Sequence, residues 1–421
     1  MRYLVGVVFA CVAALLYGQQ NRSFSESIRT VESIANGDRM AVPVIELGKG
    51  EITVSFDEMS HSHTRYLYSL QHCDRYWAPS ESLFESDFMT GTNLSAPIED
   101  CSYSTNTSNA YTHYSVSFPN ENVSMLISGN YRVNIYDEQD TNNPVATAFF
   151  SVVENRFDIA GEVTANTDID SRESHQQLSL RVNFKDVVLH DPAREVFVRV
   201  LQNNRYDIAC DAPEATFIDD HGMNWEHCRQ LIFPAGNEFR KFEIPDIHRP
   251  TLGIDKVRWF EPFYHAFLYT DRQHTNYIFT SEKNGKYVLR NATDGNPDTR
   301  SEYILVHFSL EKPLSDGDNL SNGDFYVCGA WNAYNFLPEY RMHYNAQDSK
   351  YEATILLKQG YYNYTYLFVE KDATAGSMSQ SEGDFFQTEN EYNVYVYAHL
   401  QGERYDRLMS CRTINYGTSQ N

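Results

Sequence analysis

The chain has 421 residues, of which 57 are acidic and 34 are Lys or Arg, so its formal net charge is −23. This length exceeds what one hydrophobic core usually fills, so we expect about two to four domains. An acidic chain repels nucleic-acid phosphates and anionic lipid headgroups, which excludes nucleic acid as a favoured partner. The 30 Tyr and 25 Phe are typical of pleated, half-buried strands.

The first residues have the features of a secretory signal peptide. Arg2 supplies a positive charge, the apolar run LVGVVFACVAALLYG follows, and polar residues begin at Gln19. The run of about 15 residues is shorter than the roughly 20 that a transmembrane helix needs, and it is too short before Cys11 for a lipidation signal. We therefore predict a signal peptide over 1–18 and an exported mature chain. No later segment is apolar enough to span a bilayer as a helix.

An N-terminal segment is predicted over 19–39, partly helical or disordered, because SESIRTVESIANG, from Ser25 to Gly37, is the best helical signal in the chain. Strand signals dominate afterwards. Segments such as GEITVSFDEM and SGNYRVNIYD alternate apolar and polar residues and are separated by Asn, Gly, Pro and Ser clusters. They predict a first β-sandwich over 40–155.

A second strand series predicts a middle β-sandwich over 156–297, and the turn-rich stretch ATDGNPDTRS marks a linker after it. Seven further strand signals, from EYILVHFSLE to YDRLMSCRTI, predict a C-terminal sandwich over 298–416, which we expect to resemble immunoglobulin-like and carbohydrate-binding modules. The predicted fold class is all-β, with tandem immunoglobulin-like β-sandwich domains.

Six cysteines remain beyond the predicted signal peptide, and an even count in an exported chain suggests disulfides. Because two fall in each predicted domain, the economical pairing is Cys73 with Cys101, Cys210 with Cys228, and Cys328 with Cys411.

Motifs for catalysis, nucleotide binding and zinc proteases are absent from the sequence. His61 and His63 are best interpreted as solvated loop residues, and the spacing of His221 and His227 relative to Cys210 and Cys228 fits a zinc site poorly. The sequence thus predicts no catalytic residue, no cofactor and no metal site.

The stretch KQGYYNYTYLF places Tyr362, Tyr364, Tyr366 and Phe368 on one face of a strand, and Gly360 is expected to form the turn before it. This region resembles glycogen-binding sandwich modules, with GAWNAY, from Gly329 to Tyr334, in place of their aromatic turn. That resemblance implies an aromatic ligand or interface face at Trp331 and Tyr334. However, Thr365 stands where those modules carry a sugar-binding lysine, so core or interface packing is favoured over glycan binding.

Seven unusual strings occur in order along the chain: LQHCDRYWAPS, YSTNTSNAYTHYSVSFPN, SGNYRVNIYD, SRESHQQLSL, AGNEFRKFE, KQGYYNYTYLF and TENEYNVYVY. Together they resemble the plug-protein family of the type IX secretion system of Bacteroidetes, over about residues 40–412. The resemblance implies a non-enzymatic periplasmic protein, peripherally associated with the outer-membrane complex, that occludes the periplasmic opening of the translocon barrel when no substrate is in transit. The alternative is an exported glycan-binding protein, for which exposed rings at Trp331 and Tyr334 would be required.

Overall fold

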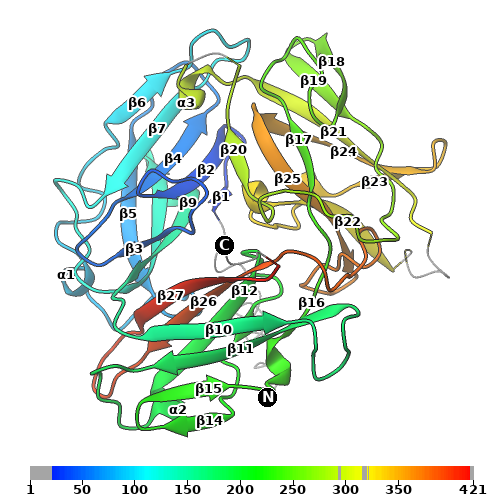
Figure 1. Cartoon of the computed structure of the whole chain (residues 1–421). Helices are drawn as coiled ribbons and strands as arrows, with labels where there is room; N and C mark the ends of the chain where they lie inside the picture. Colours follow the sequence, from blue (N-terminus) through cyan, green and yellow to red (C-terminus); the bar gives the residue numbers. More distant parts are fainter. Residues whose placement is uncertain (1–20, 293–294, 315–319, 321, 418–421) are drawn as a thin grey trace, which may run out of the picture.

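The computed structural model describes residues 21–292, 295–314, 320 and 322–417, so the predicted signal peptide over 1–18 lies outside the described residues. Strand is the main secondary structure of the described residues, and the strands form six sheets. These sheets face one another in pairs, and each pair encloses a hydrophobic core. Figure 1 shows the three resulting sandwiches around a common centre. The predicted all-β fold of sandwich domains is confirmed.

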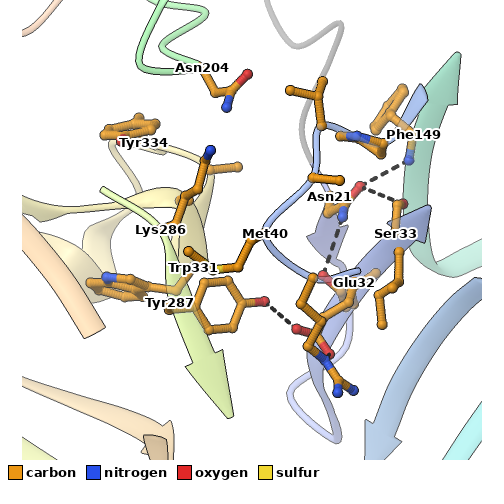
Figure 2. Close-up of a pocket in the computed structure, with 18 of the residues that line it drawn as sticks. Asn21, Glu32, Ser33, Met40, Phe149, Asn204, Lys286, Tyr287, Trp331 and Tyr334 are labelled. Carbon is orange, nitrogen blue, oxygen red and sulfur yellow. Dashed lines mark hydrogen bonds and ion pairs between the residues drawn. The ribbon is translucent and has the colours of Figure 1, made fainter. Parts of the chain in front are cut away.

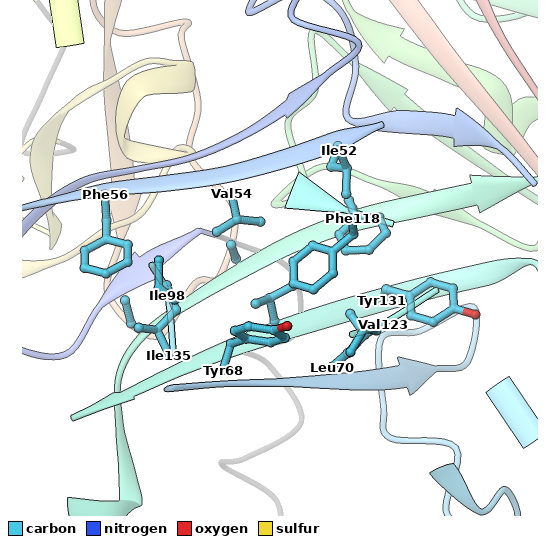
Figure 3. Packing of buried hydrophobic residues seen from close by; sticks show 14 of the residues in the cluster. Ile52, Val54, Phe56, Tyr68, Leu70, Ile98, Phe118, Val123, Tyr131 and Ile135 are labelled. Carbon is cyan, nitrogen blue, oxygen red and sulfur yellow. The ribbon is translucent and has the colours of Figure 1, made fainter. Parts of the chain in front are cut away.

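The first domain begins with the strand at Arg22 and ends with the strand that closes at Val153. Its elements are β1 (Arg22–Ser23), β2 (Ile28–Ala35), β3 (Val44–Glu46), β4 (Ile52–Glu58), β5 (Tyr66–Cys73), α1 (Glu85–Phe88), β6 (Asp100–Tyr103), β7 (Thr112–Phe118), β8 (Gly129–Asp137) and β9 (Asp140–Val153). One sheet has the order β1-β9-β8-β5 with β3 beside β9, and the other has the order β2-β4-β7-β6. Side chains such as Val54, Phe118 and Tyr131 fill the space between them (Figure 3).

The expectation that the segment 19–39 is partly helical or disordered is wrong for its described residues, 21–39, because they supply β1 and β2 to the first sandwich. The register of β2 against β4 shifts between Arg29 and Glu32, so β2 carries one extra residue there, and Thr30 has a φ of 50°. Such a β-bulge interrupts the alternation of period two. The apolar residues Ile28, Val31 and Ile34 consequently acquire a spacing of three, which imitates a helix.

The second domain is built from two separated parts of the chain. Its elements are β10 (Asp158–Thr164), β11 (His175–Asn183), α2 (Pro192–Glu195), β12 (Val196–Gln202), β13 (Cys210–Asp211), β14 (Phe217–Asp219), β15 (Gly222–Trp225), η2 (Arg229–Leu231), β16 (Ile232–Pro234), β26 (Glu391–Ala398) and β27 (Arg407–Asn415). One sheet has the order β10-β11-β15-β14 with β16 beside β11, and the other has the order β13-β12-β26-β27.

The third domain lies between β16 and β26 in the sequence. Its elements are β17 (Arg240–Glu243), β18 (Ile254–Phe260), β19 (Phe263–Leu268), β20 (Tyr287–Leu289), α3 (Pro297–Arg300), β21 (Tyr303–Glu311), β22 (Gly323–Cys328), η4 (Ala330–Asn332), η5 (Pro338–Tyr340), β23 (His343–Asn345), β24 (Lys350–Lys358) and β25 (Gly360–Glu370). One sheet has the order β17-β25-β20 with β22 also beside β25, and the other has the order β18-β19-β21-β24-β23.

The predicted boundaries of the last two domains, 156–297 and 298–416, therefore differ from the structure. β26 pairs with β12 from Val196 opposite Ala398 to Gln202 opposite Tyr392, which assigns the last two strands to the second sandwich. Conversely, β17 to β20 belong to the third sandwich. The alternation of apolar residues identifies a strand but does not show with which strand it pairs. The sequence therefore suggested three consecutive domains, whereas the third domain is inserted into the second.

The tyrosine-rich strand β25 is a structural strand. Tyr362, Tyr364 and Tyr366 lie in the core of the third domain, while Leu367 on the opposite face packs with Phe239 in a separate cluster. A Cβ atom on Gly360 would lie 2.6 Å from the backbone oxygen of Val288. The glycine is thus required by close approach of β20, and not by the positive φ that the predicted turn implied.

Candidate functional site

The predicted aromatic face at Trp331 and Tyr334 is not an exposed flat patch. Tyr334 is 1% exposed and lies in the cluster that includes Phe239. Trp331 is half-buried, and its Nε1 donates a hydrogen bond to the backbone oxygen of Asn363 at 3.1 Å. Its ring meets the ring of Tyr340 edge-on. The exposed rings that the glycan-binding alternative required are therefore missing from this turn.

The six cysteines are free thiols in the structure, so the predicted disulfides are not formed. The pairing of Cys328 with Cys411 fails because the first lies on β22 of the third domain and the second on β27 of the second domain. Cys73 packs with Trp77 and Phe149, away from the core that Cys101 contacts. Cys210 and Cys228 both contact the core of the second domain. Burial raises the pKa of Cys411 to about 12, which makes this thiol a poor nucleophile.

A buried ion pair joins the first and third domains. Lys358 Nζ lies 2.6 Å from Asp57 Oδ2, and each side chain is only 1% exposed. Two further donors reach the same carboxylate: Tyr303 Oη at 2.6 Å and His113 Nδ1 at 2.7 Å. Burial raises the pKa of Asp57, but Lys358 and His113 more than offset this, and the pKa lies below its ordinary value. The carboxylate is therefore held in its charged form inside the interface.

Local strand geometry explains why these residues meet. Asp57 lies on β4 with Thr53 and Ser55, on the face that points away from the core of the first domain. Lys358 is paired with Tyr303 at the end of the β21–β24 ladder, on the face of that sheet opposite the core of the third domain. The two outward faces meet at this point, and Lys358 also lies 4.3 Å from the centre of the Tyr111 ring.

The first and second domains are joined by two arginines. Arg75 Nη1 lies 2.9 Å from Asp406 Oδ2, and its guanidinium is 3.7 Å from the centre of the Phe197 ring. Arg407 Nη1 donates to Glu154 Oε1 at 3.0 Å. Apolar contacts around these pairs come from both domains, including Val153, Leu201, Tyr395, Tyr397 and Leu408.

The second and third domains meet around Arg205. Its side chain is 5% exposed, and its Nη2 lies 2.6 Å from both Asp207 Oδ2 and the backbone oxygen of Gly376. The guanidinium is 6.0 Å from the centre of the Tyr334 ring, which packs with Phe239, Leu367 and Met378. Lys286 of the third domain adds an ion pair with Glu391 of the second, at 2.8 Å.

A small cavity lies where all three domains meet. Its walls include Phe149 of the first domain, Asn204 of the second and Lys286 of the third. Tyr287 Oη donates to Glu32 Oε1 at 2.7 Å across the junction, as Figure 2 shows. The cavity volume of about 150 Å³ is well below the 300–1,000 Å³ of typical ligand pockets. This space is therefore too small for an oligosaccharide or a peptide.

Within the described ranges, no group of three or more His, Cys, Asp and Glu side chains is placed to hold a metal ion. In the same part of the chain, no helix has the length and apolarity that a membrane crossing requires.

Sequence reasoning missed the charged residues that join the domains. One signal was available: Lys358 is a lone charge at the end of the apolar run Ile355 to Leu357, and Asp57 directly follows the core residue Phe56. An isolated charge in a buried strand indicates an ionic partner. Lys358 and Asp57 are 301 residues apart in the sequence, so the sequence does not show that they are partners.

The structure defines the class of the protein: it is an all-β protein of three sandwiches that contact one another, and buried charged residues join these domains. Residues 28–154 match the model of the type 9 secretion system plug protein 1st domain. The whole structure is similar to the crystal structure of a hypothetical protein from Parabacteroides merdae, with a TM-score of 0.90 and 33% identity, covering 94% of this chain and 99% of that chain. The comparison with curated proteins found no match. The first sandwich therefore matches the first domain of type 9 secretion system plug proteins, and the whole chain shares its fold with the Parabacteroides merdae protein.

Proposed function

We propose that this protein is a non-enzymatic, periplasmic plug subunit that occludes the periplasmic opening of the outer-membrane translocon barrel of the type IX secretion system when no substrate is in transit. The match of residues 28–154 to the plug-protein first-domain model supports a place in the secretion system. The observation that carries the occluding role is the arrangement of three sandwiches around one junction, with every pair of domains in contact.

A body that closes a wide opening has to keep its shape. Domains joined only by linkers move relative to one another by default. Here each domain contacts both others, and the ion pairs Lys358–Asp57 and Arg205–Asp207 are almost fully buried. Opening the interface between the first and third domains would separate Lys358 from Asp57 and leave both charges without their main partner. Opening the interface between the second and third domains would break the hydrogen bond from Arg205 to the backbone oxygen of Gly376. Insertion of the third domain into the second also ties it down at both of its ends.

A plug also has to leave when a substrate arrives. An interface of standard size, about 1,200–2,000 Å² in total, is stable without being irreversible. The acidic surface, with a net charge of −23 for the whole chain, lets charged contacts tune association, while aromatic side chains anchor the centre of such an interface.

The test is the permeability of cells that lack the protein. Deletion should leave the translocon barrel assembled but admit large antibiotics or dyes that the outer membrane normally excludes. A strain that lacks both proteins is the control, because the leak should require the barrel. Unchanged permeability after the single deletion, or the same leak without the barrel, would contradict the occluding role.

A further inference from the structure

One sheet of the third domain has an outward face of aromatic and imidazole rings. Strand pairing aligns Lys256 with Phe267, Arg258 with His265 and Phe260 with Phe263, and β21 adds His307 beside Phe267. Residues two apart on a strand share a face. We call the following set the aromatic face: Lys256, Arg258, Phe260, Phe263, His265, Phe267, Leu305, His307, Thr354 and Leu356.

The rings of the aromatic face cover one another but are not covered by another layer. Phe267 and His307 stack with their centres 4.2 Å apart, and His265 stacks on His307 at 5.0 Å. His265 Nδ1 and His307 Nε2 also share a hydrogen bond of 2.8 Å. Phe260 at the end of β18 is 55% exposed. A run of partly exposed rings on an ordered sheet is typical of an interaction surface.

The same face is positively charged in an acidic protein. Arg258 is exposed and has no ion-pair partner among the residues that the structure describes. Lys256 Nζ lies 3.8 Å from the carboxylate of the exposed Asp255 and 5.0 Å from the centre of the Phe267 ring. The carboxylate of Glu352 lies at the far end of β24, opposite Ser309. Opposite charges steer association and set specificity, so the face favours a partner with carboxylates.

The aromatic face continues an interface that already exists. Tyr303 and Lys358, the first pair of the same β21–β24 ladder, are covered by the first domain through Asp57. The next pair on the same face of this ladder, Leu305 with Leu356, is only partly buried. Leu356 also lines a groove of about 550 Å³ whose other wall includes Arg29 of the first domain. The surface therefore extends from the third domain onto the first.

A second copy of the chain fits this surface poorly. In a two-fold dimer the same patch meets itself, and the aromatic face contains no carboxylate that could pair with Lys256 and Arg258 of the other copy. Like charges brought together at an interface oppose binding. A different protein with the opposite charge is the occupant that fits.

We propose that the aromatic face docks onto a protein surface that presents carboxylates beside aliphatic side chains, and that this contact holds the plug on its translocon partner. The inference rests on the proposed function, which supplies the partner. Aromatic rings would anchor the centre of the contact, and Arg258 and Lys256 would pair with the carboxylates at its edge.

Site-specific photo-crosslinking tests the location of the contact. Phe260 is replaced by p-benzoylphenylalanine in the full chain, and Phe217, which is 57% exposed on β14 of the second domain, receives the same replacement as control. Irradiated cells should give an adduct with the translocon barrel at position 260 and none at position 217. An adduct with a second copy, equal adducts at both positions, or no protein adduct at position 260 would overturn the inference.

Charge reversal tests the chemistry of the partner. The Lys256→Glu/Arg258→Glu variant should reduce the barrel that co-purifies with the plug by at least about tenfold, a factor that corresponds to about 1.4 kcal/mol. The Lys49→Glu/Arg194→Glu variant makes the same change in net charge at exposed positions of the other two domains, and should bind normally. Unchanged melting temperatures exclude misfolding in both variants.

The outcomes separate this inference from the proposed function. If the unmodified chain does not co-purify with the barrel, the proposed function fails. If it does co-purify, and the Lys256→Glu/Arg258→Glu variant binds equally well, the assignment of the aromatic face is wrong while the plug function stands.

Discussion

The outward faces of two sheets in this protein differ in an instructive way. In the first domain, Thr53, Ser55 and Asp57 on β4 form a polar face, yet the third domain covers it at Asp57. In the third domain, Phe260, Phe267 and His307 form an aromatic face that no described domain covers. Hydrophobicity alone would predict the reverse. The ion pair of Asp57 with Lys358 determines which outward faces meet inside the chain. The aromatic face stays uncovered by the described domains, as the proposed docking onto a partner requires.

Replacement of Lys358 tests the covered polar face and should have the largest effect among changes on the two outward faces. Lys358→Met leaves the Asp57 carboxylate buried without its cation, so we expect the free energy of unfolding to fall by about 3–5 kcal/mol. Lys371→Met, at an exposed position, should change it by less than about 0.5 kcal/mol. Urea denaturation measures both. If the Asp57→Asn/Lys358→Met double variant is no more stable than the single one, the ion pair is not the source of the effect.

Loss of one hydroxyl in the same interface should have a smaller effect. Tyr303→Phe removes the donor to Asp57 and the hydrogen bond with Thr30, which have lengths of 2.6 and 2.7 Å. We expect a loss of about 1–3 kcal/mol, because the partners remain buried. Tyr344→Phe, at a 46% exposed ring, serves as the control. Equal melting temperatures for the two variants would contradict the assignment.

The pH dependence of stability should distinguish the two faces. Burial and then His265 lower the pKa of His307 from 6.5 to about 4. The unfolded chain binds the proton more readily, so stability should fall as the pH decreases from 6.5 towards 4. The lowered pKa of Asp57 acts at lower pH, because its stabilisation is lost only as the pH falls below the ordinary range of a carboxyl group.

Thermal unfolding between pH 7.5 and 4 measures this difference. Burial also lowers the pKa of His72 to about 4, so the wild-type slope contains both histidines. The His307→Phe variant should lose less stability than the wild type over this range, and a His72→Phe variant provides the comparison. Identical slopes for His307→Phe and the wild type would show that the His265–His307 pair does not affect stability.

Truncation on the aromatic face should have the smallest effect on stability. Phe260→Ala should change the free energy of unfolding by less than about 0.5 kcal/mol, since the ring is more than half exposed. Phe308→Ala on the core side of the same sheet should cost about 3–5 kcal/mol. A large loss for Phe260→Ala would mean that the aromatic face supports the fold and is not free for a partner.

Much of the fold was available from local patterns. Alternating segments such as SGNYRVNIYD predicted β8, and the tyrosine strand was correctly interpreted as a structural element. β2 was missed because its bulge disturbs the alternation at Thr30. The pairing of Cys328 with Cys411 was wrong because it assumed one C-terminal domain for both, whereas β22 and β27 belong to different sandwiches.

The sequence by itself determined the strand content, the acidic character and, through its ordered strings, the resemblance to the plug family. These features depend on side-chain type and short-range periodicity, which are readable within a few residues. Only the tertiary structure decided the insertion of the third domain, the burial of Tyr334 and the pairing of Lys358 with Asp57. Each of these depends on contacts between distant segments, and a strand's own pattern does not specify which distant segment it will meet.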